Sequence, residues 1–305
     1  MLNAHMDTVG VTGMADPFSG KIRDGKLYGR GSYDMKGSIA GILGVAKAIR
    51  DQKQQPDGDL ILSFVADEEY ESIGAQALVK KLKPDAAIVT EPTDLDICLA
   101  HRGFGIYKIT TSGKTAHGGQ HRSGVDANIK MGLLLAKLDR LAKKLPEENR
   151  HPLCGEASLH IPLIQGGKSL FIYSNECTIH VERRTLPGET ASGIASDFSS
   201  IIEELHQKDP DFQAALEQLI WRAPYEVDQN APIVSEVRKA ASTGPGDQPA
   251  FIGHTWWEDS AIFGEAGIET VIIGPKGGGI HEEVEWVDVD SVTDLAGILY
   301  RVAIG

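Results

Sequence analysis

The stretch DAAIVTEPT, residues 85–93, is an apolar run that ends in polar residues, which is typical of a buried strand. LILSFVAD, residues 60–67, has the same character and ends in an acidic side chain. Between these two strands, residues 73–82 have the apolar spacing of a helix that Pro84 stops. Before both strands, the apolar spacing of residues 39–50 predicts another helix. Strands that alternate with helices predict an α/β fold built on a mostly parallel sheet.

The pattern changes near residue 97, where strands of alternating polarity begin. Residues 104–113 alternate as a half-exposed antiparallel strand does. Further on, the chain predicts a helix, two alternating strands, a second helix, and a segment that fits a strand or a helix: 125–145, 157–167, 173–184, 192–207 and 212–225. This order describes an inserted α+β (βαββαβ) domain. We therefore expect one discontinuous domain over 1–97 and 226–305 and an inserted domain over 98–225.

Composition excludes several classes of protein. The formal net charge of −13 over 305 residues argues against nucleic-acid binding through a general basic face. The longest apolar runs are too short to cross a membrane, and no basic segment precedes an apolar run as in a secretory signal. Three cysteines without a C-x-x-C pair support neither a disulfide framework nor a four-cysteine zinc site, so we expect a reducing, cytoplasmic location.

Polar side chains collect where the predicted strands end, or in glycine-flanked loops. They are His5, Asp7, Asp34, Glu68, Glu69, Glu91 and His281. Two histidines with several carboxylates suit zinc, cobalt or manganese. One bridging carboxylate, with a histidine and a carboxylate on each side, would hold two metal ions that share a water and lower its pKa. A carboxylate outside the ligand set must then accept the proton, and the Glu68–Glu69 pair offers both roles.

The order of these motifs resembles the M20 metallopeptidases, the group of acetylornithine deacetylase, succinyl-diaminopimelate desuccinylase, aminoacylase and glutamate carboxypeptidase. The matching motifs span nearly the whole chain: HMD (5–7), GRGSYDMKG (29–37), DEE (67–69), TEPT (90–93) and GGGIHEEVEWV (277–287). The resemblance implies a catalytic domain with a pair of divalent metal ions, most often zinc, and a lid domain that supports a homodimer.

The resemblance also implies individual roles. Asp34 would bridge both metals, His5 would bind one and His281 the other, and Glu69 and Glu91 would each complete one site. Asp7 would orient His5, and Glu68 would be the general base.

Two lid segments match as well. GKTAHGGQHRSGVDAN (113–128) resembles the segment whose histidine, here His117, reaches across the dimer to polarise the substrate carbonyl. VERRTLPGE (181–189) resembles the segment whose arginine, here Arg184, binds a substrate carboxylate, although Glu182 stands where many members have aspartate. The implied substrates are small N-acyl amino acids or short peptides with a free carboxylate, and neither the acyl group nor the amino acid is specified.

A rival hypothesis is a truncated, non-catalytic relative that only holds metal or forms a dimer. Members of the family usually carry several tens of residues before HMD, whereas here only MLNA (1–4) precedes His5. So short a strand at a chain end is expected to pair weakly. The motif HEEVE is not H-E-x-x-H, because Glu285 stands where the second histidine belongs. We expect Asp259 near the site, without an assigned role.

Overall fold

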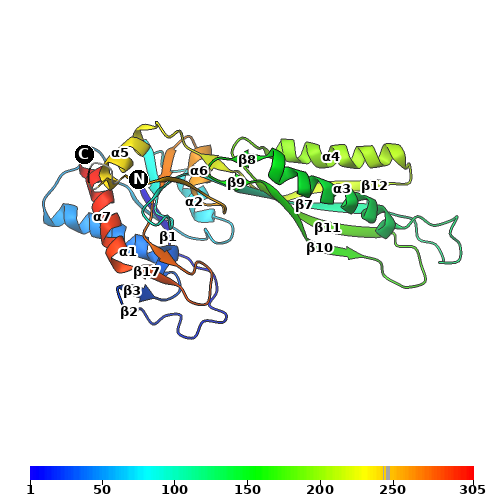
Figure 1. Ribbon diagram of the computed structural model, residues 1–305, viewed down its shortest axis with the longest axis horizontal. Coiled ribbons are helices and arrows are strands. Elements are labelled where there is room, and N and C mark those ends of the chain that lie inside the picture. Colours follow the sequence, from blue (N-terminus) through cyan, green and yellow to red (C-terminus); the bar gives the residue numbers. More distant parts are fainter. Residues whose placement is uncertain (243, 245–247) are drawn as a thin grey trace. The chain divides into compact units, whose positions relative to one another are not determined.

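The computed structural model describes residues 1–242, 244 and 248–305. The chain divides into two compact units (Figure 1). The first comprises residues 1–100, 226–254 and 258–305, and the second comprises residues 101–225 and 255–257.

A seven-stranded sheet forms the first unit, and it is mostly parallel as predicted. Its order is β13-β6-β15-β5-β1-β4, with β14 also paired to β6. β1 runs parallel to β4 and β5, β5 runs parallel to β15, and β15 meets β6 in the antiparallel sense. The strands are β1 (Leu2–His5), β4 (Leu62–Val65), β5 (Ala86–Val89), β6 (Ile97–His101), β13 (Tyr225–Glu226), β14 (Phe251–His254) and β15 (Glu269–Ile272).

The expectation that the first strand pairs weakly is wrong. β1 lies between β4 and β5, and all four of its residues are buried. Leu2 to His5 pair in register with Leu62 to Val65, and the other edge of β1 pairs with β5. Because hydrogen bonds hold both edges of β1, its short length does not leave it loose. His5 is therefore fixed at the carboxyl end of a central strand.

Among the described residues, five helices accompany this sheet. They are α1 (Gly37–Asp51), α2 (Ile73–Leu78), α5 (Pro232–Ala241), α6 (Ser260–Glu265) and α7 (Val289–Ile304). The Asp288 side chain caps α7 by accepting a hydrogen bond from the Ser291 amide. α1 packs closely on α7, since a Cβ added to Gly41 would lie 3.5 Å from the Val292 carbonyl oxygen. α2 ends at Leu78, four residues earlier than predicted.

A small second sheet of the first unit follows the order β16-β17-β3-β2. Its strands are β2 (Lys21–Arg23), β3 (Lys26–Tyr28), β16 (Gly277–Gly278) and β17 (Trp286–Asp288). The irregular turn η1 (Ser32–Lys36) leads from this region into α1. Neither this sheet nor α7 was predicted from the sequence.

The second unit is the predicted βαββαβ arrangement. Its antiparallel sheet has the order β10-β11-β7-β12, and α3 and α4 cover one face of that sheet (Figure 1). The elements are β7 (Gly103–Ser112), α3 (Ala127–Glu148), β8 (Arg150–His151), β9 (Gly155–Glu156), β10 (Ser158–Gly166), β11 (Glu176–Thr185), α4 (Ala191–Lys208) and β12 (Gln213–Arg222).

Alternate residues of these strands make the core of the second unit. Tyr107, Ile109, Ile179 and Val181 are fully buried against α3 and α4. The segment at 212–225, which the sequence left open, forms a strand because β12 pairs along almost the whole of β7. No helix in the described part of the chain is long and apolar enough to cross a membrane.

Candidate metal centre

The five predicted metal ligands come together at the carboxyl edge of the parallel sheet. They form two adjoining groups, one of His5, Asp34 and Glu91 and one of Asp34, Glu69 and His281. Within each group the candidate ligand atoms all lie within 4.8 Å of one another. The fold explains the gathering, because parallel strands present their carboxyl ends, and the loops that follow them, at one edge.

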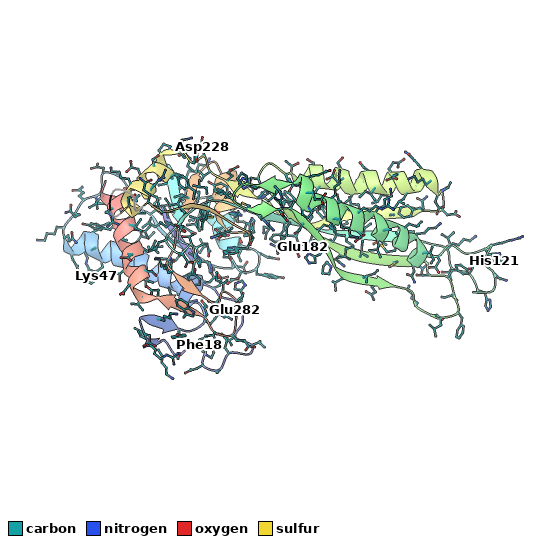
Figure 2. All side chains as sticks on the ribbon, in the orientation of Figure 1. Phe18, Lys47, His121, Glu182, Asp228 and Glu282 are labelled. Atoms are coloured by element: carbon teal, nitrogen blue, oxygen red, sulfur yellow. The ribbon has the colours of Figure 1, made fainter. Side chains whose placement is uncertain are left out.

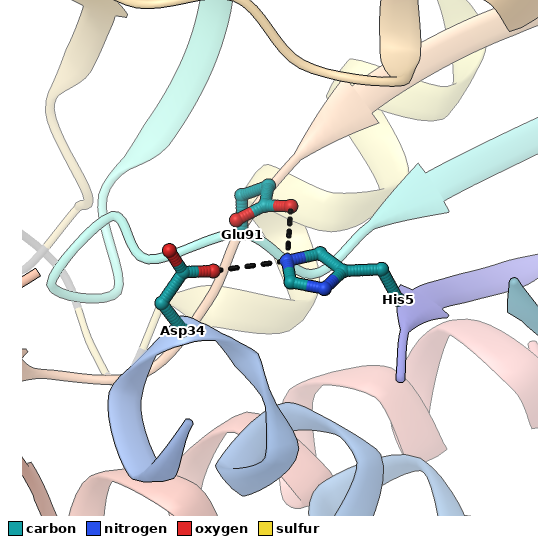
Figure 3. Close-up of side chains that lie close together, drawn as sticks. All are labelled: His5, Asp34 and Glu91. Carbon is teal, nitrogen blue, oxygen red and sulfur yellow. Dashed lines mark hydrogen bonds and ion pairs between the residues drawn. The ribbon is translucent and has the colours of Figure 1, made fainter. Parts of the chain in front are cut away.

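Asp34 is the centre of the arrangement, because each of its two carboxylate oxygens faces a different histidine. Oδ1 lies 2.9 Å from His5 Nε2, and Oδ2 lies 3.2 Å from His281 Nε2. His5 Nε2 is also 3.5 Å from Glu91 Oε1, and His281 Nε2 is 3.1 Å from Glu69 Oε2. Figure 3 shows the Nε2 atom of His5 facing both Asp34 and Glu91. A carboxylate in this position is suited to bridge two cations.

The electrostatics of the cluster favour bound positive charge. Burial lowers the pKa of His5, but Glu91, Asp34 and Asp7 outweigh it and raise that pKa to about 12. Hydrogen bonds with Asp34 and Glu69 raise the pKa of His281 to about 10. Both imidazoles are therefore doubly protonated and positively charged at neutral pH in the metal-free protein. Two imidazoles and three carboxylates are a donor set that fits zinc, cobalt or manganese.

Asp7 lies behind His5, on the side away from Asp34. The Nδ1 atom of His5 is 3.1 Å from the Asp7 carbonyl oxygen and 3.6 Å from Asp7 Oδ1. The other carboxylate oxygen of Asp7 accepts a hydrogen bond of 3.1 Å from the Glu69 amide. With a hydrogen on Nδ1 engaged by Asp7, His5 turns its Nε2 atom toward the metal position.

Glu68 belongs to neither ligand group. Burial and the negative charge of Asp259 raise the pKa of Glu68 well above its usual value, and Asp34 and Glu69 add to this shift. The same interactions indicate that Glu68 lies beside the metal ligands. A raised pKa suits a carboxylate that accepts a proton and then gives it back.

Two buried acidic residues near α6 had no role assigned from the sequence. Glu258 and Asp259 are buried just before that helix, and Glu258 pairs with the buried His254. Asp259 raises the pKa of Glu68, and Glu258 adds to the raised pKa of Glu91. The sequence indicated only that Asp259 lies near the site, and it gave no sign of Glu258.

The two remaining candidates, His117 and Arg184, belong to the second unit. His117 is exposed in the loop after β7, where it bridges to Ile172 and accepts a hydrogen bond from the Gly119 amide. Arg184 on β11 forms an ion pair with Glu182 and lies over the ring of Phe104. Neither belongs to the two ligand groups.

Comparison with known proteins agrees with this geometry. The model of peptidase family M20/M25/M40 matches residues 1–304. Acetylornithine deacetylase of Myxococcus xanthus is 29% identical over 287 residues, which cover 92% of this chain and 72% of that protein. Acetylornithine deacetylase of Buchnera aphidicola from Schizaphis graminum is 26% identical over 313 residues, covering 99% of this chain and 79% of that protein.

Solved structures share the fold at low sequence identity. Aminopeptidase PepT from Bacillus cereus superposes with a TM-score of 0.79 at 19% identity, over 99% of this chain and 79% of that one. The YXEP protein of Bacillus subtilis, described as a dinuclear metal binding peptidase from M20 family, gives a TM-score of 0.76 at 16% identity. The superposition covers 99% of this chain and 80% of that one. The chain is therefore a hydrolytic enzyme of peptidase family M20/M25/M40 that acts on amide or peptide bonds.

Proposed function

We propose that this enzyme hydrolyses the amide bond of N-acyl amino acids, or of short peptides with a free carboxylate, with the help of two divalent metal ions. The observation that carries the proposal is the position of Asp34, with one oxygen toward His5 and the other toward His281. His5, Asp34 and Glu91 would hold one ion, and Asp34, Glu69 and His281 the other. Zinc is the ion we expect, with cobalt or manganese as alternatives.

The bound ions would lower the pKa of a water molecule and polarise the carbonyl group of the substrate. Glu68 accepts a proton from the water as its oxygen adds to the carbonyl carbon. Glu68 then gives that proton to the leaving nitrogen while the carbon–nitrogen bond breaks, which yields a carboxylic acid and an amine. The acid then gives its proton to the amine, so the final products are a carboxylate and an ammonium ion. Asp7 keeps the imidazole of His5 oriented throughout.

Substrate recognition falls to the second unit in this proposal. Arg184 would hold the free carboxylate of the substrate, since a guanidinium group can bind both carboxylate oxygens. Its existing partner Glu182 would have to share or release it. His117, supplied from the second copy of a dimer, would polarise the scissile carbonyl. The acetylornithine deacetylases among the relatives support an N-acyl amino acid as the substrate class.

We further propose that the second unit, the lid, forms a homodimer. β10 is an edge strand of its sheet, and Leu163 and Ile164 on it are 61% and 59% exposed. Ile129 on the neighbouring α3 is 67% exposed. An open strand edge beside exposed apolar side chains suits pairing with a second copy. We also propose a cytoplasmic location, because three cysteines without a C-x-x-C pair support no disulfide framework.

The proposed role of Glu68 is tested by Glu68→Gln, which keeps the shape of the side chain but removes the base. We expect bound metal to be retained and kcat to fall by about 10²- to 10⁴-fold. Glu71→Gln, at an exposed glutamate three residues further on, is the control and should leave kcat unchanged. More than about a tenth of the wild-type kcat in Glu68→Gln would refute the role. Full metal content without turnover in the wild-type chain would instead favour a non-catalytic relative.

A further inference from the structure

Glu285 is a buried carboxylate that belongs to neither metal-ligand group. Its residue is 1% exposed, and its two oxygens accept four hydrogen bonds from one short segment. Oε2 accepts from the Gly31 amide at 2.8 Å and from Arg30 Nη1 at 2.7 Å. Oε1 accepts from the Tyr33 amide at 2.9 Å and from the Asp34 amide at 3.0 Å. One carboxylate thus binds the backbone on both sides of residue 32 and the amide of Asp34 itself.

The segment is shaped to receive an anion. Gly31 has a left-handed backbone with φ of 76°, and the turn η1 begins directly after it. A turn that follows a left-handed residue points successive amides inward, which is a common way to bind a negative group. The guanidinium of Arg30 neutralises the carboxylate, and both side chains are almost fully buried, at 4% and 0% exposed. A neutral side chain could not accept all four hydrogen bonds.

Glu285 also ends the loop that presents His281. Gly279 opens that loop with a φ of 78°, and a Cβ added there would lie 1.9 Å from the Val284 carbonyl oxygen, so the loop is tightly closed. Arg30 Nη2 donates to the Glu282 carbonyl oxygen at 2.9 Å, and the Gly29 amide donates to the Glu285 carbonyl oxygen at 3.1 Å. The loop of His281 and the turn of Asp34 are therefore joined directly, with Glu285 at the junction.

The two ligand groups differ in what supports them. His5 ends the central strand β1, and Glu91 lies two residues beyond β5, so the parallel sheet holds both. His281 is half-exposed in a loop, and its position relative to Asp34 depends on the junction at Glu285. Loss of this junction should therefore weaken metal binding by the group that contains His281 more than metal binding by the group that contains His5.

We propose that Glu285 is a positioning residue that sets the distance between Asp34 and His281 and thereby completes the second metal site. The proposal rests on the proposed dinuclear function. In this proposal Glu285 strengthens binding of the second metal ion more than binding of the first, in addition to any effect on the stability of the fold. A merely structural residue would weaken both metal sites together as the folded state is lost.

The experiment is a titration of zinc ions into the chelator-treated full chain, for the wild type and for Glu285→Gln. The variant replaces one acceptor oxygen with a donor while keeping the shape of the side chain. We expect the first zinc ion to bind close to the wild-type affinity and the second to bind about 10- to 100-fold more weakly. Glu282→Gln, at an exposed position of the same loop, is the control and should bind both ions as the wild type does (Figure 2).

Glu285→Asp is the second variant, because Glu285→Gln leaves Arg30 without its buried partner and can lose its fold. The aspartate keeps the charge but withdraws it by one methylene group, and we expect a smaller weakening confined to the second ion. Wild-type binding of both ions by the folded variants would overturn the proposal, and so would equal weakening of both together with a lower unfolding temperature. A wild-type chain that binds fewer than two ions would overturn the proposed dinuclear function itself.

Discussion

Loading the metal-free enzyme with zinc near neutral pH should release about two protons per chain. A histidine must be neutral to bind a metal ion, so a charged imidazole gives up its proton on binding. The metal-free cluster holds the pKa of His5 at about 12 and that of His281 at about 10, against an ordinary value of 6.5. Both imidazoles are therefore charged between about pH 7 and pH 9 before metal binds.

The pH dependence of binding follows from this proton release. Each metal ion displaces one imidazole proton, so the logarithm of each apparent binding constant should rise by about one per pH unit in this range. Glu91, whose pKa burial raises well above its usual value, can add to the number of protons released but cannot reduce it. The slope should flatten toward pH 10, where His281 begins to lose its proton without metal.

Isothermal titration calorimetry measures the release directly. The zinc titration is repeated in two buffers of equal pH but different ionisation enthalpy, and the difference in heat gives the number of protons. His281→Ala should reduce the release by about one proton, while His121→Ala, at an exposed loop histidine, should leave it unchanged. A release well below one proton per chain, or binding constants that do not change with pH, would refute the charged metal-free cluster.

Three further predictions concern other parts of the molecule. Arg184→Gln should raise KM by about 10- to 100-fold for an N-acyl amino acid, since hydrogen bonds to charged groups contribute about 1.5–3 kcal/mol. KM for the corresponding C-terminal amide, which has no carboxylate, should stay the same. An equal rise for both substrates would rule out a contact between Arg184 and the carboxylate. Leu163→Glu should convert a dimer into monomers in sedimentation velocity, whereas a wild-type monomer would rule out the proposed interface. Metal-free enzyme should lose stability to urea as the pH rises from about 6.5 to about 10, while zinc-loaded enzyme should not. A raised pKa stabilises the folded state fully below the unfolded value of 6.5, and this contribution is lost as the pH rises to the folded value, about 10 for His281. Equal urea midpoints for the metal-free protein at pH 7 and pH 10 would contradict that prediction.

The parts of the fold that could be predicted are those that depend on the local spacing of apolar residues. The buried runs at 60–67 and 85–93 became β4 and β5, and the alternation at 104–113 became β7. Local patterns carry this information because burial on one face or on both faces of a strand dictates the spacing of its apolar residues. The polar residues that follow these strands could be picked out as site candidates in the same way, because each apolar run shows where its strand ends.

Features that depend on distant pairing were not predictable in this way. Four residues at 2–5 do not reveal that they form a central strand, because that depends on partners at 62–65 and 88–89. The strand β12 was ambiguous until its pairing with β7 decided it. Glu285 was noticed only as the wrong residue for a zinc motif, because its four donors lie about 250 residues earlier in the chain.

The central claim is that two metal ions per chain are needed for hydrolysis. The most direct measurement is to titrate chelator-treated protein with zinc while following both bound metal and the turnover of an N-acyl amino acid. The account predicts no turnover without metal and a rise in turnover that ends at two bound ions per chain. Full turnover with one bound ion, or turnover that persists in the metal-free protein, would contradict it.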